Sequence, residues 1–146
     1  MGTVHRRRSG SRDGLDAGWD GVDPQAYPHP DLAGVLKHEL IGAREGADSY
    51  TIRYFHVPAG GRTARESHPH DHGVMILSGR ARVTLGSQVH ELSEGDVVYV
   101  EGDELHCFEA LGPQPLGFLC VVPPRAVTPL RAHPQPRSGP RAGGLT

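Results

Sequence analysis

The chain has few cysteines and no long hydrophobic run, and both shortages exclude classes of protein. Only two of its 146 residues are cysteine, Cys107 and Cys120, which is too few for the disulfide framework of a small secreted domain. The longest apolar run, residues 117–122, has the length of a strand and not of a membrane span. The arginines at 6–8 are followed by polar residues and not by the apolar stretch of a secretion signal. These features predict a cytoplasmic protein with buried, reduced thiols.

An excess of charge of one sign is also missing. The formal net charge is −2, from 15 basic and 17 acidic residues, and Lys37 is the only lysine. Such a balance does not favour a nucleic-acid groove or a binding site for an anionic membrane surface. We therefore expect neither nucleic acid nor membrane as a partner.

Composition divides the chain into one core and two tails. Residues 1–30 are rich in Gly, Asp and Arg and predict a disordered or loosely docked N-terminal arm, in which Trp19 and Tyr27 can dock locally on the domain. Residues 123–146 predict a tail rich in Pro and Arg. The remaining residues, 31–122, have the length of a single domain.

The core shows the pattern of strands. No segment repeats apolar residues at the spacing of a helix, and short runs rich in apolar and β-branched residues are separated by Gly, Pro and Asp. The predicted strands are 35–41, 50–57, 74–77, 81–85, 88–92, 97–100, 105–110 and 116–122. Many short strands at even spacing favour a closed antiparallel barrel or a two-sheet jelly roll, so the predicted fold class is all-β.

Histidine is abundant, and its spacing carries the main functional signal. The chain has 10 histidines, and His68, His70 and His72 alternate in sequence beside Glu66. In an extended strand Glu66 and His68 point to one face, and a turn over residues 69–71 lets the chain re-enter as a strand with His72 directed inward. His70 falls at the expected tip of this loop and is left out of the predicted ligand set.

His106 adds a candidate ligand from a distant part of the chain. It opens a predicted strand with Phe108 and Ala110 on the same face, whereas Cys107 is expected to point to the other side. The predicted metal ligands are Glu66, His68, His72 and His106. One carboxylate and three imidazoles suit a single divalent ion of iron, manganese, nickel, copper or zinc, provided that a coordination position stays open for a substrate.

Two motifs in the core resemble those of the cupin superfamily. Pro-Ala-Gly-Gly at 58–61 leads into Glu-Ser-His at 66–68, and this segment closes with Leu-Ser-Gly at 77–79. Residues 95–106 are similar to the second motif, which consists of Gly-Asp, an apolar strand, a Gly and a His. The resemblance implies a small single-domain bacterial cupin with a jelly-roll β-barrel over residues 31–122.

The first motif departs from the usual cupin pattern. Glu66 stands where most cupins have their first histidine, and Gly73 stands where they usually have a glutamate. His72, one residue earlier, is similar to the extra histidine of four-histidine cupins. In the second motif Glu101 replaces the usual proline and Ala110 the usual asparagine. The resemblance therefore implies a permuted ligand set and leaves the identity of the metal open.

The resemblance also implies a function and a state of assembly. The leading hypothesis is a metal-dependent oxygenase, of dioxygenase type, that acts on a small organic molecule, with Glu66 either as a ligand or as a catalytic base. One alternative is a non-oxidative isomerase, lyase or cyclase that uses the metal as a Lewis acid. Another is a non-catalytic cupin that binds a metal or a small molecule. Barrels of this kind often pair, which implies a homodimer.

The strand expected at 50–57 supplies two further candidates. Tyr54 and His56 alternate with Ile52, and we predict that they face the barrel interior as catalytic or substrate-lining residues. The alternative for Tyr54 is an ordinary structural role at the barrel rim. Arg53 and Arg65 then alternate away from the interior, which does not favour a phosphorylated or strongly acidic substrate. A slip of one residue in the register would exchange the two faces.

Overall fold

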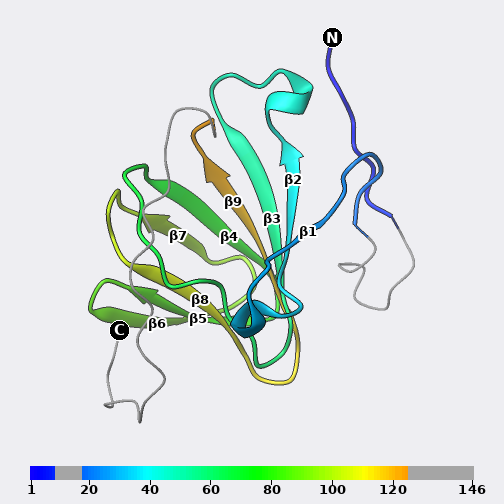
Figure 1. The fold of residues 1–146 in the computed structure, drawn as a ribbon. Helices are drawn as coiled ribbons and strands as arrows, with labels where there is room; N and C mark the ends of the chain where they lie inside the picture. Colours follow the sequence, from blue (N-terminus) through cyan, green and yellow to red (C-terminus); the bar gives the residue numbers. More distant parts are fainter. Residues whose placement is uncertain (9–17, 125–146) are drawn as a thin grey trace.

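The fold is that of a computed structural model, which describes residues 1–8 and 18–124 (Figure 1). Apart from short 3₁₀ turns, the regular elements in these residues are β-strands, which confirms the predicted all-β class. In chain order they are β1 (Gln25–Ala26), η1 (Pro30–Leu32), β2 (Leu36–Ile41), η2 (Ala43–Glu45), β3 (Thr51–Val57), β4 (His72–Ser78), β5 (Arg80–Leu85), β6 (Gln88–Leu92), β7 (Val97–Val100), β8 (His106–Leu111) and β9 (Leu116–Val122). The C-terminal tail predicted from residue 123 lies, beyond residue 124, outside the described residues.

Each strand predicted from the sequence is present as one of β2 to β9, with small shifts at its ends. The short strand β1, whose residues are exposed, was not predicted, because a pair of residues shows no alternation of polar and apolar side chains. Within the described ranges, no helix is long and apolar enough to cross a membrane.

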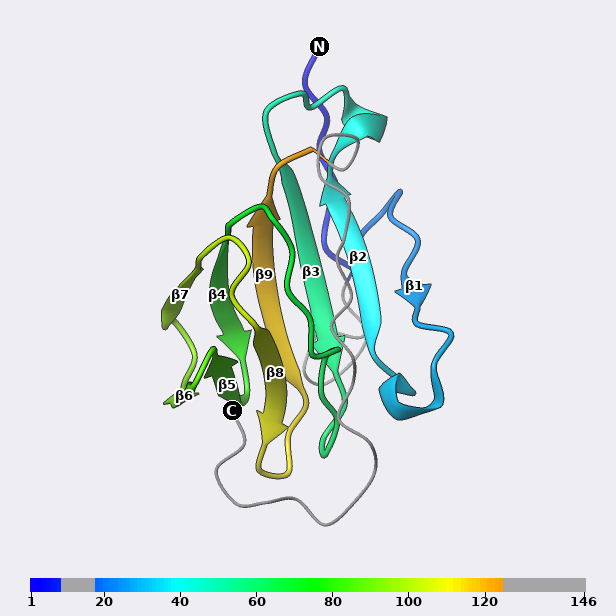
Figure 2. The same cartoon turned by 60° about the vertical axis from the view of Figure 1, so that its left-hand side comes forward.

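The strands form two antiparallel sheets. One has six strands in the order β1-β2-β3-β9-β4-β7, and the other has three in the order β6-β5-β8. Figure 1 shows the smaller sheet lying opposite β4 and β9 of the larger one, and Figure 2 shows β9 between β3 and β4 at its centre. The segment Gly61–Glu66 continues the smaller sheet, because Arg62 bridges to Glu109 and Glu66 bridges to His106 along the free edge of β8.

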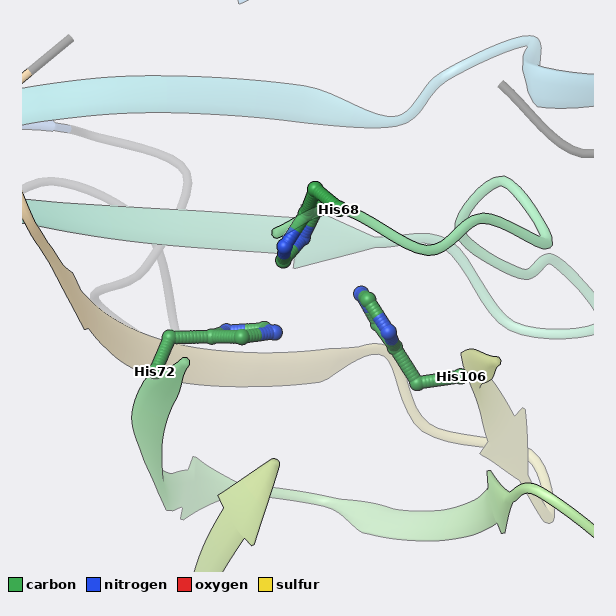
Figure 3. Close-up of side chains that lie close together, drawn as sticks. All are labelled: His68, His72 and His106. Carbon is green, nitrogen blue, oxygen red and sulfur yellow. The ribbon is translucent and has the colours of Figure 1, made fainter. Parts of the chain in front are cut away.

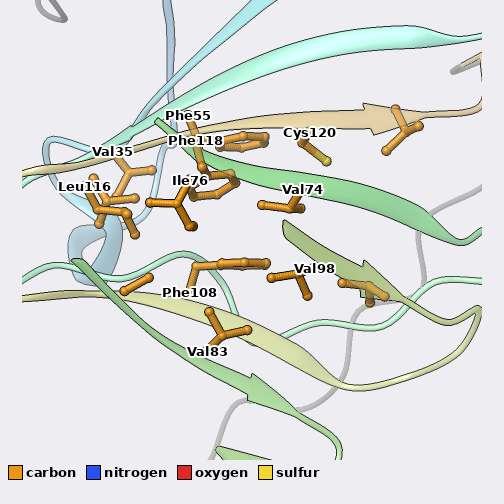
Figure 4. Packing of buried hydrophobic residues seen from close by; sticks show 14 of the residues in the cluster. Val35, Phe55, Val74, Ile76, Val83, Val98, Phe108, Leu116, Phe118 and Cys120 are labelled. Carbon is orange, nitrogen blue, oxygen red and sulfur yellow. The ribbon is translucent and has the colours of Figure 1, made fainter. Parts of the chain in front are cut away.

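The hydrophobic core fills the space between the two sheets (Figure 4). Val74 and Ile76 of β4 are buried there, as their alternation with His72 predicts. Phe118 of β9 stacks on Phe108 of β8 with ring centroids 4.7 Å apart, so aromatic contacts join the larger sheet to the smaller one. The core therefore holds the starts of β4 and β8, which carry histidines, at fixed positions.

Strand β3 has the opposite register to the one predicted, which is a correction. Phe55 and Val57 belong to the core, so the odd-numbered residues of β3 point inward and Arg53 shares their face. Tyr54 and His56 lie on the outer face. The prediction failed because both faces of β3 carry apolar or aromatic side chains, and their alternation alone does not show which face is the interior.

The outer face of β3 is covered by the described part of the N-terminal arm. The Trp19 ring packs edge-on against Tyr54 at 5.0 Å and against His38 at 5.6 Å between ring centroids. Tyr54 is completely buried and His38 is 2% exposed. Two parts of the arm also pair with each other, because Arg7 and Trp19 form an antiparallel β-bridge. A buried aromatic cluster thus joins the arm to the barrel wall.

We predict that acid loosens this cluster through His38. Burial, and then the nearby His56, lowers the pKa of His38 below its ordinary value of 6.5. The docked arm therefore binds fewer protons than the undocked one, and its stability is lost progressively as the pH falls below 6.5. Trp19 is the only tryptophan, so its fluorescence measures docking directly.

The control is His38→Phe, which keeps a ring but cannot take up a proton. The arm should undock at a lower pH in this variant than in the wild type, as measured by the fluorescence of Trp19. Identical transitions in both proteins would show that His38 does not set the acid stability of the arm.

Candidate metal centre

Three histidines from separate segments meet at one end of the barrel (Figure 3). His72 begins β4, His106 begins β8, and His68 lies in the segment that precedes β4. One ring nitrogen from each lies within 4.8 Å of the others, and the side chains are buried, with relative exposures of 6%, 3% and 2%. Figure 3 shows the rings directed toward a common point.

Hydrogen bonds fix the tautomer of two of these rings. The Nδ1 atom of His68 lies 3.0 Å from the carbonyl oxygen of His70, and that of His106 lies 2.9 Å from the carbonyl oxygen of Glu104. A carbonyl oxygen only accepts, so each Nδ1 carries the proton and donates it. The lone pair then resides on Nε2, which is the usual arrangement for a histidine that binds a metal.

His72 is anchored by a thiol. Its Nδ1 atom is 3.1 Å from Sγ of Cys120, and its Nε2 atom is buried without a hydrogen-bond partner. Burial, and then the neighbouring His106 and His68, lowers the pKa of His72 to about 2, so the ring is neutral at neutral pH. A neutral imidazole with an unsatisfied buried nitrogen is a suitable metal ligand, and the three-histidine set fits a divalent ion.

Glu66 lies beside this group without being part of it. Its backbone exchanges hydrogen bonds with His106, at 3.2 Å and 3.0 Å, and paired residues of antiparallel strands project to the same face. Burial raises the pKa of the Glu66 carboxyl, and the charges of His68, Arg53 and Lys37 partly offset that rise. The structure thus places a carboxyl with an increased proton affinity on the face of His106.

His70 packs on the outside of the three-histidine group. Its ring stacks on that of His68 with centroids 3.8 Å apart and planes inclined by 7°. Burial, and then the charge of His68, lowers its pKa to about 4. His70 is not in the group of converging nitrogen atoms, in keeping with its predicted place in the loop.

Close backbone contact joins the loops that precede His72 and His106. The backbone N–H of Asp103 donates to the carbonyl oxygen of His68 at 2.7 Å. A Cβ atom on Gly102 would collide with the carbonyl oxygen of Pro69, so only glycine permits this approach. The two sequence motifs therefore hold each other in place.

Comparison with known proteins agrees with this arrangement. The model of the cupin domain family matches residues 53–122. Over 106 residues, the chain is 37% identical to 1-methylthio-D-xylulose 5-phosphate methylsulfurylase of Rhodospirillum rubrum, and the match covers 71% of this chain and 67% of that protein. The chain belongs to the cupin family.

Solved structures of bacterial cupins have the same fold. A cupin-2 domain protein of Rhodospirillum rubrum has a TM-score of 0.66 at 36% identity, with 72% of this chain and 71% of that chain covered. A cupin 2 conserved barrel domain protein of Rhodopseudomonas palustris has a TM-score of 0.70 at 29% identity, with 83% and 80% covered.

The structure does not bring the predicted pair Tyr54 and His56 to the histidines of this cupin. They lie on the outer face of β3, and Tyr54 contacts Trp19. Sequence reasoning also missed Arg53 and Cys120, which both face the interior near the site. Phe55 and Val57 could have indicated the direction of Arg53. Two apolar residues at alternate positions mark an inward face, and Arg53 is the next residue on that face.

Cys120 is the residue that we expect to orient His72 for metal binding. Because a group that supports a metal-bound histidine typically contributes about 10- to 100-fold to metal affinity, Cys120→Val should weaken metal binding by that order. The measurement is competition with a chelator of known affinity, using the full chain. Both cysteines are buried and free, so Cys107 offers a matched control.

The control thiol faces away from the site. Cys107 donates to the carbonyl oxygen of Thr63, and burial, followed by the charge of Glu109, raises its pKa to about 11. Cys107→Val should lower the free energy of unfolding about as much as Cys120→Val does, but it should leave metal affinity unchanged. Equal losses of metal affinity in both variants would refute the orienting role of Cys120.

Proposed function

We propose that this cupin is a metal-dependent enzyme that acts on a small organic molecule by non-oxidative chemistry. The observation that supports it best is the convergence of His68, His72 and His106, each anchored through Nδ1. Three protein ligands leave coordination positions for a substrate, as in catalytic rather than structural metal sites. When bound, the ion would act as a Lewis acid that polarises an oxygen atom of the substrate.

Glu66 completes the proposed site as a base or as a further ligand. A carboxylate whose pKa is raised by burial is better matched to proton transfer near neutral pH than an ordinary glutamate. Its position beside His106 puts it within the same buried region as the three rings. A proton removed from the substrate would reside on the Glu66 carboxyl, while burial of the histidines limits access of water.

The related methylsulfurylase favours the non-oxidative proposal over an oxygenase. Its name describes a reaction on a methylthio sugar phosphate, and it shares 37% identity with this chain. The oxygenase expected from the sequence uses the same ligand set and remains the competing proposal, because three histidines and a carboxylate also suit an ion that activates oxygen.

Metal binding is the first prediction of the proposal. Protein purified without a metal-affinity tag should hold about one divalent ion per chain, since a catalytic site of this kind takes a single ion. His72→Ala and His106→Ala should each remove the metal, as measured by elemental analysis. The control is His90→Ala, because His90 is exposed on β6. Retention of metal by both site variants would refute the site.

Oxygen consumption separates the two candidate reactions. The first substrate to test is 1-methylthio-D-xylulose 5-phosphate, the compound in the name of the relative. Turnover should proceed without oxygen uptake, and Glu66→Gln should lower kcat by about 100-fold or more because proton transfer contributes that much to rates. Stoichiometric oxygen uptake would instead establish the oxygenase.

We also propose that the cupin forms a homodimer through the outer face of its larger sheet. Met75, Val97, Tyr99 and Val121 are exposed by 42%, 67%, 62% and 44%. Met75 pairs with Val97, and Gly73 pairs with both Tyr99 and Val121, so these side chains form one patch across three neighbouring strands. A contiguous exposed apolar patch of this kind is typical of protein contact surfaces.

A charge within this patch should separate the subunits. Val97→Glu is expected to convert a dimer to a monomer, as measured by light scattering after size-exclusion chromatography. Val89→Glu is the matched control, because Val89 is 44% exposed but lies on β6 of the other sheet. A wild type that is monomeric at all concentrations tested would contradict this proposal.

A further inference from the structure

Arg53 brings a positive charge to the inward face of β3, close to the three histidines. Its Nη2 atom donates to Sγ of Cys120 at 3.3 Å, and the same sulfur atom contacts Nδ1 of His72. Its guanidinium carbon lies 5.1 Å from the centroid of the Phe55 ring. One thiol therefore separates the guanidinium from a predicted metal ligand.

The guanidinium of Arg53 donates to a thiol, and no anionic group in the part of the chain that the structure describes accepts a hydrogen bond from it. Among the described residues, no carboxylate forms an ion pair with Arg53, and its Nε atom is buried without a hydrogen-bond partner. A guanidinium has five N–H donors, and the half-buried guanidinium of Arg53 uses one of them on a thiol. An anionic ligand could therefore accept hydrogen bonds from the others.

The charge of Arg53 also opposes the binding of a metal. Its guanidinium contacts the thiol that contacts Nδ1 of His72, and like charges this close to one another repel. A divalent ion there would add to this repulsion. Glu66 reduces it but forms no ion pair with Arg53. An anionic ligand between the ion and the guanidinium would offset the remaining charge.

Lys37 adds a second cation on the same face. It pairs with Phe55 across β2 and β3, so its side chain projects to the inward side of the sheet. The only lysine of the chain thus accompanies Arg53 toward the site. Glu39 is opposite Arg53 on this face, but its carboxyl group lies against Gly42 and, within residues 1–8 and 18–124, forms no ion pair with Arg53. The two positive charges of Arg53 and Lys37 on one face suit a doubly charged oxyanion.

We propose that Arg53, with Lys37, binds the phosphate group of the substrate beside the three histidines and thereby selects phosphorylated molecules. The planar fork of a guanidinium donates two parallel hydrogen bonds to phosphate oxygens, which a lysine cannot do alone. The placement of this anion next to a metal rests on the proposed function. The anion site itself depends only on Arg53 and Lys37.

Inorganic phosphate is the probe that tests this inference. Its binding to the full chain is measured by calorimetry, in metal-free and Mn²⁺-loaded protein, for the wild type, Arg53→Met and Arg53→Lys. Arg53→Met should weaken binding by about 10- to 100-fold, because it removes charge-assisted hydrogen bonds, and Arg53→Lys should weaken it less. Arg82→Met is the control, since Arg82 lies on the exposed face of β5 beside Glu91.

Two further measurements keep this test separate from that of the metal site. Metal content should not decrease in Arg53→Met, because the substitution removes a repulsive charge, and the retained metal also shows that the variant folds. The ³¹P resonance of phosphate should broaden in Mn²⁺-loaded wild type but not in the Mn²⁺-loaded Arg53→Met variant.

The outcomes distinguish the two proposals. Phosphate binding that depends on Arg53, in a wild-type protein that takes up no Mn²⁺ or other divalent ion, would retain the anion site and overturn the proposed metal-dependent function. Phosphate binding equal in wild type and Arg53→Met, or acetate binding tighter than phosphate, would overturn the anion site and leave the metal proposal intact.

Discussion

The pairing of residues 61–66 with strand β8 is the constraint on which the site depends. Thr63 donates its backbone N–H to the carbonyl oxygen of Phe108 and accepts from the N–H of Phe108 through its hydroxyl oxygen. Glu66 and His106 then exchange backbone hydrogen bonds. Because a shift of one residue along this pairing would turn Glu66 away from His106, the hydrogen bonds of the backbone determine which side chains meet.

The second requirement is that each buried histidine keeps a lone pair directed toward the metal. Burial lowers the pKa of His72, and carbonyl oxygens accept from Nδ1 of His68 and His106, so the lone pairs lie where a metal would need them. The same arrangement leaves the site poor in negative charge. Glu66 and any ligand anion must therefore balance a bound ion, which is why the surroundings of the rings matter as much as the rings.

Much of the fold and part of the site could be predicted from the sequence. The strands were predictable because their apolar runs are short and end at Gly, Pro or Asp. His68, His72 and His106 were predictable because strand alternation and the second motif give each of them a direction. Cys120 could not be assigned a role, since its contact with His72 joins strands that are distant in the sequence. Such a contact follows from sheet order, which local patterns do not specify.

The register of β3 shows how one residue of displacement changes the expected chemistry. With Tyr54 inward the site would be polar and neutral, whereas with Arg53 inward it is cationic. A glycine on the neighbouring strand explains the observed choice. A Cβ atom on Gly117 of β9 would collide with the Tyr54 hydroxyl, so the tyrosine side chain lies over a position where only glycine leaves room.

The N-terminal arm reinforces this choice from outside the barrel. Trp19 covers the ring of Tyr54 on the outer face, so the tyrosine is buried without entering the core. Since neighbouring residues of a strand point in opposite directions, the burial of Tyr54 outside directs Arg53 inside. The contact between the arm and the barrel wall therefore helps to determine the charge that a substrate meets next to the three histidines.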